Sequence, residues 1–530
     1  MNSILKKLPH WSSHSGLLIT LLICLLVITP VILNQLVPLN DYPFHLARII
    51  ILSNLDNPVY SEFYKQGSFL LPNMAMDMIA IPLTYCVSAE TASRIFVMLS
   101  LLSMLFGTML LHRAAHNRFS PWPLLAVILL FNGIFRFGFL NYIFGIGVAF
   151  CAASLWLIQK PGYKRLFVSL IMSIFLVLLH FSAFGIYAII IGSVEIYTAY
   201  IRLQKDSLKS SVSQLFISSI PFFITIALFI YFSPTAEEVS TTGFNYPNYL
   251  GAKPFGALYS VLTGITWLDI LSLSSLAITT AFLVITKKIK IFPPLLFSLL
   301  MLMLAFIVLP SSFMGSSFVY VRLGPAIALL WLTTIDIKAE QVSINRLIAY
   351  LALILAIFTS VAITNQWERF NKQTSEIIST FDRTEQGATI FNATTQPFTR
   401  LIADTEDRRF AWNPPLKHIA SYAVLYGPKF VPMTFADLTK QPLNVNDKYQ
   451  VIKNFQGDNP RKTFTAQELE IYLLEIRNHL KNGDWPALDN VYVFVMGFDR
   501  IKNSFNISKL DGWAHVVELN DDHILIKLKS

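Results

Sequence analysis

The stretch PLNDYPFHLARIII, residues 38–51, follows directly on a long apolar run and carries an acidic, an imidazole and a basic side chain. Asp41, His45 and Arg48 are spaced i, i+4 and i+7, so on a helix they lie on one face. The stretch therefore predicts a short helix whose ionisable residues lie at a membrane surface.

The composition indicates a membrane protein. Of 530 residues, 54% are hydrophobic and only 14% are charged, whereas a soluble protein carries roughly 25% charged residues. The net charge is +9, and residues 365–530 hold 20 basic and 20 acidic side chains. The positive excess therefore belongs to the first 364 residues, among apolar segments, where it indicates membrane topology and not nucleic-acid binding.

Apolar runs long enough for membrane helices recur through these 364 residues. The first follows Lys6 and Lys7 like a signal peptide, but it has no clear small-residue cleavage site, so we expect a retained first span. About eleven spans are predicted, at 16–37, 92–111, 121–139, 142–158, 166–181, 183–201, 212–232, 266–286, 291–309, 320–336 and 346–363.

The distribution of basic residues predicts the orientation. With a cytoplasmic N-terminus, fifteen basic residues fall on the cytoplasmic side and five on the other side, a positive-inside bias. An odd number of spans then places residues 365–530 outside the cytoplasm. We expect an integral protein of a bacterial inner membrane with a periplasmic C-terminal domain.

Two outer loops are long. The first, 38–91, contains LPNMAMDMIAIPLTYC (71–86), which Asp77 and Pro82 interrupt, and it predicts a helix at the membrane interface. The second, 233–257, is rich in Pro, Gly and aromatic residues and is expected to form a mobile flap.

After residue 364 the composition changes to that of a mixed α/β domain, 365–530, beside a transmembrane domain, 1–364. GATIFNA, KFVPMTFA, VYVFVMGF and HILIKLK read as strands, and the last is expected to pair with WAHVVEL across Asn520–Asp522. AQELEIYLLEIRNHLKNG reads as an amphipathic helix that ends at Gly483.

Ionisable residues in or beside a membrane are costly and are therefore functional candidates. They are Asp41, His45, Arg48, Asp77, Arg136, His180, Glu195 and Arg322.

Each candidate also has a structural interpretation. Asn40 or Asp41 can cap the helix, with Pro43 in its first turn, and His45 and Arg48 can simply reach solvent. The remaining interpretations are a carboxylate partner for Arg136, for which Glu195 is one candidate, a packed and hydrogen-bonded His180, and a lipid-phosphate contact for Arg322.

A first span followed by a long outer loop that opens with DYPFHLAR (41–48) resembles the GT-C superfamily of membrane glycosyltransferases. GFLNYIFGIG (138–147) and LLHFSAFGIY (178–187) also resemble segments of bacterial GT-C-like proteins. Many spans followed by an extracytoplasmic α/β domain complete the likeness. The chain departs from the family in the next outer loop, where Glu237 and Glu238 are present without a clear second acidic motif.

The resemblance implies an inverting enzyme that moves a sugar from a polyprenyl-phosphate carrier to a glycan, lipid or protein acceptor on the outer face of the membrane. Asp41 would be the general base or a ligand of a divalent metal. Substrate contacts would come from His45, Arg48, Asp77, Arg136, His180 and Arg322, with cationic groups on the departing phosphate.

Two other classes remain open. A lipid or glycan transporter would use Arg136, His180 and Glu195 as a polar pathway, although the two halves of the chain show no internal repeat. The second of these classes is a scaffold within an envelope-polymer assembly.

Overall fold

The structure is a computed structural model that describes residues 14–204, 207–235, 246, 252–313, 316–338, 341–395, 416–436, 439–458 and 463–529. Most of the expected flap at 233–257, with Glu237 and Glu238, lies outside these residues. The chain forms two compact units. The first unit comprises Met1–Leu33, Leu70–Ala75 and Ile95–Asn365, and the second comprises Asn34–Phe69, Met76–Arg94 and Gln366–Ser530.

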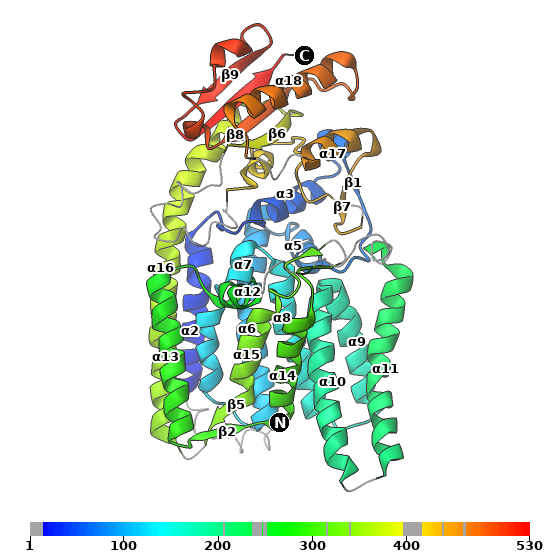
Figure 1. Cartoon of the computed structure of the whole chain (residues 1–530), viewed down its shortest axis with the longest axis vertical. Coiled ribbons are helices and arrows are strands. Elements are labelled where there is room, and N and C mark those ends of the chain that lie inside the picture. The colour runs from blue at the N-terminus through cyan, green and yellow to red at the C-terminus, as the bar shows by residue number, and fades with distance from the viewer. Residues whose placement is uncertain are drawn as a thin grey trace. The chain divides into compact units, whose positions relative to one another are not determined.

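The first unit is built from helices that run side by side (Figure 1). Every apolar run identified in the sequence falls on helical structure, which confirms a polytopic helical protein. Seven of the described helices are long and apolar enough to cross a membrane: α2 (His14–Leu33), α6 (Ala89–His116), α8 (Leu140–Ile158), α10 (Phe181–Leu203), α11 (Leu208–Phe232), α13 (Thr266–Ile285) and α16 (Val342–Ser379).

Shorter helices complete this unit. They are α9 (Tyr163–Leu179), α12 (Ala252–Val261), α14 (Pro293–Val308) and α15 (Leu323–Thr334). The run at 121–139 differs from the single span expected there, because it forms a 3-10 helix (Trp122–Leu129) followed by the short α7 (Gly133–Phe137). The break has a local cause, since the Asn132 side chain accepts from the backbone N–H groups of Ile134 and Phe135 and so starts a new helix.

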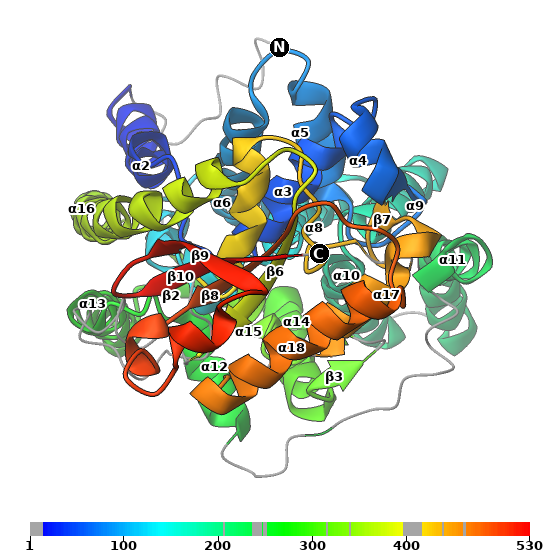
Figure 2. The same cartoon turned by 90° about the horizontal axis from the view of Figure 1, so that it is seen from above.

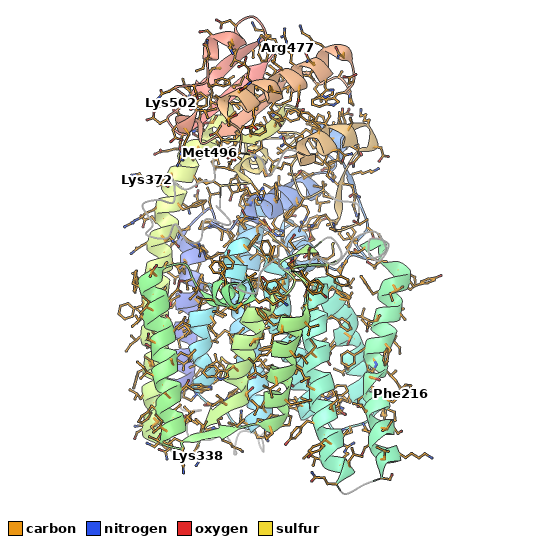
Figure 3. All side chains as sticks on the ribbon, in the orientation of Figure 1. Phe216, Lys338, Lys372, Arg477, Met496 and Lys502 are labelled. Carbon is orange, nitrogen blue, oxygen red and sulfur yellow. The ribbon has the colours of Figure 1, made fainter. Side chains whose placement is uncertain are left out.

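Small residues allow the helices to approach closely. A side chain at Gly147 on α8 would meet the backbone of Ser103 on α6, and one at Gly107 would meet the carbonyl of Gly147. Glycines at such crossings let helix backbones pack in a membrane, where the hydrophobic effect does not drive helix association. By contrast, Phe216 points outward from α11 and is 65% exposed (Figure 3), as suits a side chain that faces lipid.

Short strands join the helices of this unit. β2 (Ile289–Ile291) pairs antiparallel with β5 (Ile335–Ile337), and β3 (Ser312–Phe313) pairs with β4 (Ser316–Ser317).

The second unit contains a four-stranded sheet in the order β6-β8-β10-β9. β6 (Thr389–Thr394) runs parallel to β8 (Val491–Met496), and β10 (His523–Leu528) is antiparallel to β8 and to β9 (Ala514–Leu519). Three of the expected strands and the terminal hairpin are thereby confirmed.

The strand expected from KFVPMTFA is wrong. Only an isolated bridge between Phe430 and Thr389 forms there. A turn follows at once, in which the Thr434 N–H donates to the carbonyl of Val431, and Pro432 has no N–H to offer a sheet.

The amphipathic helix is confirmed as α18 (Ala466–Asn482), which lies beside the sheet (Figure 2). Thr465 and Glu468 form a reciprocal capping box at its start, and Gly483, with a φ of 72°, ends it in the left-handed region.

Much of the first outer loop folds within this second unit. α3 (Tyr42–Leu52) packs against the 3-10 helix η6 (Ile419–Tyr426), and β1 (Tyr64–Gln66) pairs antiparallel with β7 (Leu443–Val445). The expected helix within 71–86 is α5 (Ala75–Leu83). Residues of the first outer loop therefore contact residues of the C-terminal region within the second unit.

Candidate functional site

The helix predicted from residues 38–51 is α3, on which His45 and Arg48 are neighbours. Arg48 donates through its NH2 group to Nδ1 of His45 at 3.2 Å. His45 and Arg48 are both buried, so the interpretation that they simply reach solvent is wrong.

Arg48 is held on several sides. Its Nε and NH2 groups donate to the two carboxylate oxygens of Asp77 at 2.7 and 2.8 Å, and NH1 donates to Oε1 of Gln441 at 2.6 Å. Burial raises the pKa of the Asp77 carboxyl, and the Arg48 guanidinium opposes that rise. This bidentate pair joins α3 to α5, and its hydrogen bonds position both side chains.

Asp41 occupies the N-cap position of α3 but does not cap it. Its backbone is in the helical region, with a φ of −92° and a ψ of −2°, and its side chain makes no capping hydrogen bond. The carboxylate Oδ1 accepts instead from Nδ2 of Asn40 at 2.7 Å. The purely structural interpretation of Asp41 as a helix cap is therefore wrong, and its carboxylate is directed to other groups.

A histidine that the sequence reasoning missed lies beside Asp41. Nε2 of His418 is 3.7 Å from the Asp41 Oδ1, and the His418 ring stacks on Phe44 with ring centroids 3.9 Å apart. Burial, with a smaller effect of Lys417, lowers the pKa of His418 well below its ordinary value, which favours the neutral imidazole. No local motif marks this residue, because its neighbour in space is 377 positions away by residue number.

The first unit brings together His180 and Arg322. The Ser182 N–H donates to Nδ1 of His180 at 3.1 Å, which makes His180 the N-cap of α10. Nε2 of the same ring lies 3.3 Å from the NH1 group of Arg322, whose NH2 group donates to the carbonyl of Ser317 at 2.9 Å.

Aromatic rings surround this pair. The Arg322 guanidinium lies over the Phe139 ring, 4.3 Å from its centroid, and the Tyr142 hydroxyl donates to the Arg322 carbonyl. The Tyr142 ring also meets His180 edge to face. Because His180 and Arg322 are both largely buried, their orientation is set by these contacts.

Arg136 lies in a different group of contacts. A Cβ at Gly264 would fall 1.7 Å from the Arg136 NH1 group, and the φ of +83° at Gly264 also requires glycine. The Asp269 carboxylate holds this turn by accepting from the N–H groups of Thr263 and Gly264, and it interacts electrostatically with Arg136. The expected carboxylate neighbour of Arg136 is thus Asp269.

Glu195 is not the partner of Arg136. Its carboxylate accepts from Nε1 of Trp156 at 3.0 Å and from Ser218 at 2.9 Å, and it pairs with Arg165 at 3.3 Å. The Arg165 guanidinium also lies over the Trp156 ring, 4.0 Å from its centroid. One side chain from each of α8, α9, α10 and α11 meets in this cluster.

The divalent-metal alternative for Asp41 requires further ligands beside its carboxylate. Among the residues that the structure describes, no group of three or more His, Cys, Asp or Glu side chains could hold a metal ion. Glu237 and Glu238 lie outside these residues, so the divalent-metal alternative for Asp41 stays a prediction, and no step below passes through a metal.

The helical architecture with its α/β region is similar in fold to a solved structure along nearly the whole length of both chains. A solved structure similar to this chain is ArnT from Cupriavidus metallidurans, determined bound to undecaprenyl phosphate. The two share 10% sequence identity with a TM-score of 0.54, over 97% of this chain and 98% of that one. No protein-family profile and no curated sequence matches the chain.

Proposed function

We propose that this protein is a membrane glycosyltransferase that takes a sugar from a polyprenyl-phosphate carrier and transfers it to a hydroxyl-bearing acceptor. The fold supports the proposal, because the similar ArnT structure was determined with undecaprenyl phosphate bound. The acceptor class stays a glycan, lipid or protein on the outer face of the membrane.

The observation that carries the proposal is the pairing of His180 with Arg322. Since Nδ1 of His180 accepts from Ser182, a neutral imidazole bears its proton on Nε2. That N–H faces the Arg322 NH1 group at 3.3 Å, and a guanidinium N–H can only donate.

Two donors that face each other gain little from their contact. An anionic oxygen placed beside them accepts from both, and a phosphate oxygen suits the planar guanidinium best. Aromatic contacts hold both groups before any ligand arrives, so binding the phosphate requires little reorganisation.

The reaction is a single displacement. Asp41 accepts the proton of the acceptor hydroxyl while its oxygen forms a bond to the anomeric carbon. The bond from that carbon to the phosphate oxygen breaks, and polyprenyl phosphate leaves with the electron pair. The His180–Arg322 pair is the proposed binding site for the phosphate of the carrier within the first unit. Attack opposite the departing bond inverts the anomeric carbon.

The transporter alternative gains no support from the contacts. It requires Arg136, His180 and Glu195 to act as one polar pathway, and each has different partners, namely Asp269, Arg322 and Arg165 respectively.

The test is an assay of the purified protein with a panel of polyprenyl-phosphate sugars, which scores sugar transfer and slow donor hydrolysis. Asp41→Asn should lower turnover by about 100-fold or more while donor binding is kept, because an amide cannot take the proton. Asp56→Asn, at an exposed position after α3, is the matched control. Loss of activity in a chelator would instead require a metal-dependent step.

Two results would count against the proposal. One is a parent protein that neither transfers nor hydrolyses any donor in the panel. The other is an Asp41→Asn variant with full turnover, which would direct the search for the base to Asp77 or Glu62.

A further inference from the structure

The N-terminal turn of α3 presents more than Asp41 to its surroundings. Phe44 is three residues after Asp41, so on the helix the two side chains are neighbours. Phe44 stacks on His418 with an interplanar angle of 27°, and the same imidazole points Nε2 at the Asp41 carboxylate. The aromatic residue of the DYPFHLAR motif thereby holds an imidazole against the acidic one.

The protonation of His418 decides the nature of this contact. A distance of 3.7 Å between nitrogen and oxygen is compatible with an ion pair. Burial, however, lowers the pKa of His418 well below its ordinary value, which favours the neutral ring. The contact is therefore between a neutral imidazole and a carboxylate.

The tautomer follows from the same geometry. A lone pair on Nε2 would repel the carboxylate oxygen, so the proton of the neutral ring belongs on Nε2, where it points to Asp41. Nδ1 is then an acceptor, and this buried atom has no hydrogen-bond partner among the described residues. The Nδ2 group of Asn40 donates a second hydrogen bond, of 2.7 Å, to the same Oδ1 of Asp41.

We propose that His418, which the C-terminal region supplies, is a positioning residue for Asp41. Its Nε2–H and the Asn40 amide orient the carboxylate. This inference rests on the proposed function, and it gives the C-terminal region, residues 366–530, a part in the reaction. The gap of 3.7 Å shortens to a hydrogen bond when the acceptor fills the site, since catalytic hydrogen bonds are commonly long without substrate.

The other charged groups near α3 are already engaged. Arg48 is paired with Asp77 and contacts His45, and Lys417 adds a smaller effect to that of burial in lowering the pKa of His418. Removal of the His418 N–H should therefore act on Asp41 directly. A hydrogen bond to an ionised carboxylate lowers its pKa, so its loss should raise the pKa of Asp41.

The experiment compares pH–rate profiles of His418→Phe and His418→Gln with that of the parent. Phe keeps the stack on Phe44 and removes the N–H, so turnover should fall about tenfold and the acid limb should move up by about one pH unit. The donor KM should stay unchanged. Gln restores an N–H donor and should return the limb toward the parent position.

His479 offers a matched control within the same unit. It also contacts a carboxylate, Asp484, at 3.0 Å and stacks on an aromatic ring, Trp485, with centroids 4.8 Å apart. His479→Phe should leave both turnover and the acid limb unchanged.

An infrared titration follows the same pair without turnover. The carboxylate band that Asp41→Asn removes reports the pKa of Asp41, and His418→Phe should shift its midpoint upward. An unshifted midpoint together with an unshifted acid limb would overturn the role of His418. If His418→Phe shifts the midpoint but the parent transfers no sugar, the proposed function is overturned and the coupling between His418 and Asp41 still holds.

Discussion

Arg48 donates to both carboxylate oxygens of Asp77 across 29 residues of sequence, and both side chains are completely buried. Each was a candidate substrate contact from sequence alone. Their mutual engagement indicates that they hold α3 against α5, and through α3 the position of Asp41.

Asp77→Asn should therefore act mainly on stability. Removing one member of a buried ion pair leaves the other charge uncompensated, which costs about 3–5 kcal/mol of unfolding free energy. Melting temperature measured in detergent checks this. Asp521→Asn, in an exposed pair with Lys502, is the control and should change little. An Asp77→Asn variant with normal stability but no activity would assign Asp77 to the substrate instead.

Arg322→Lys tests the phosphate site. Lysine keeps the positive charge but loses the planar fork and the contact over Phe139, so affinity for a polyprenyl-phosphate analogue should fall while expression is kept. Arg322→Ala should bind more weakly still. Parent-like binding by both variants, measured by titration with the analogue, would remove Arg322 from the site.

The membrane orientation is also open to measurement. Fifteen basic residues on one side of the predicted spans favour a cytoplasmic N-terminus and an external C-terminal domain. Reporter fusions at about residue 290 and at the C-terminus should then report opposite compartments. If both report the cytoplasm, the predicted number of spans is wrong.

Lys429 predicts a pH dependence of stability. Its side chain is fully buried, donates to the Tyr426 carbonyl at 2.6 Å, and burial lowers its pKa from 10.5 to about 8. Between these two values the unfolded chain binds a proton that the folded chain does not, so stability should rise as the pH increases from 8 to 10.5.

Replacing Lys429 with Met should remove this contribution. The melting temperature of the variant should then rise less than that of the parent between pH 7.5 and 10. Lys502→Met, at an exposed position of the same unit (Figure 3), is the control and should follow the parent. Equal changes in melting temperature for the parent and the Lys429→Met variant over this pH range would contradict the prediction.

Local patterns predicted the helical elements well because their causes are local. The apolar runs form helices, and the face shared by Asp41, His45 and Arg48 follows from helical periodicity. Where local signals competed, the prediction was less accurate, as at Asn132, whose side chain starts a new helix inside an apolar run.

The partners of the candidate residues could not be predicted, because they depend on tertiary contacts. Gln441 accepts a hydrogen bond from Arg48 although the two are 393 residues apart, and no local sequence pattern predicts this contact. His418 likewise carries no motif. The Arg165–Glu195 pair had a usable signal, namely a basic residue just before one apolar run and an acidic residue within the next one.

The cluster around Glu195 has a consequence for how the chain enters its membrane. Arg165 is synthesised 30 residues before the carboxylate that neutralises it, so a nascent chain that stops after α9 presents an uncompensated guanidinium to lipid. We therefore expect α9 to insert more readily together with α10, as a helical hairpin. Ser218 adds the last hydrogen bond when α11 follows. A mutation at Glu195 would thus reduce the amount of protein that reaches the membrane, before any question of its activity arises.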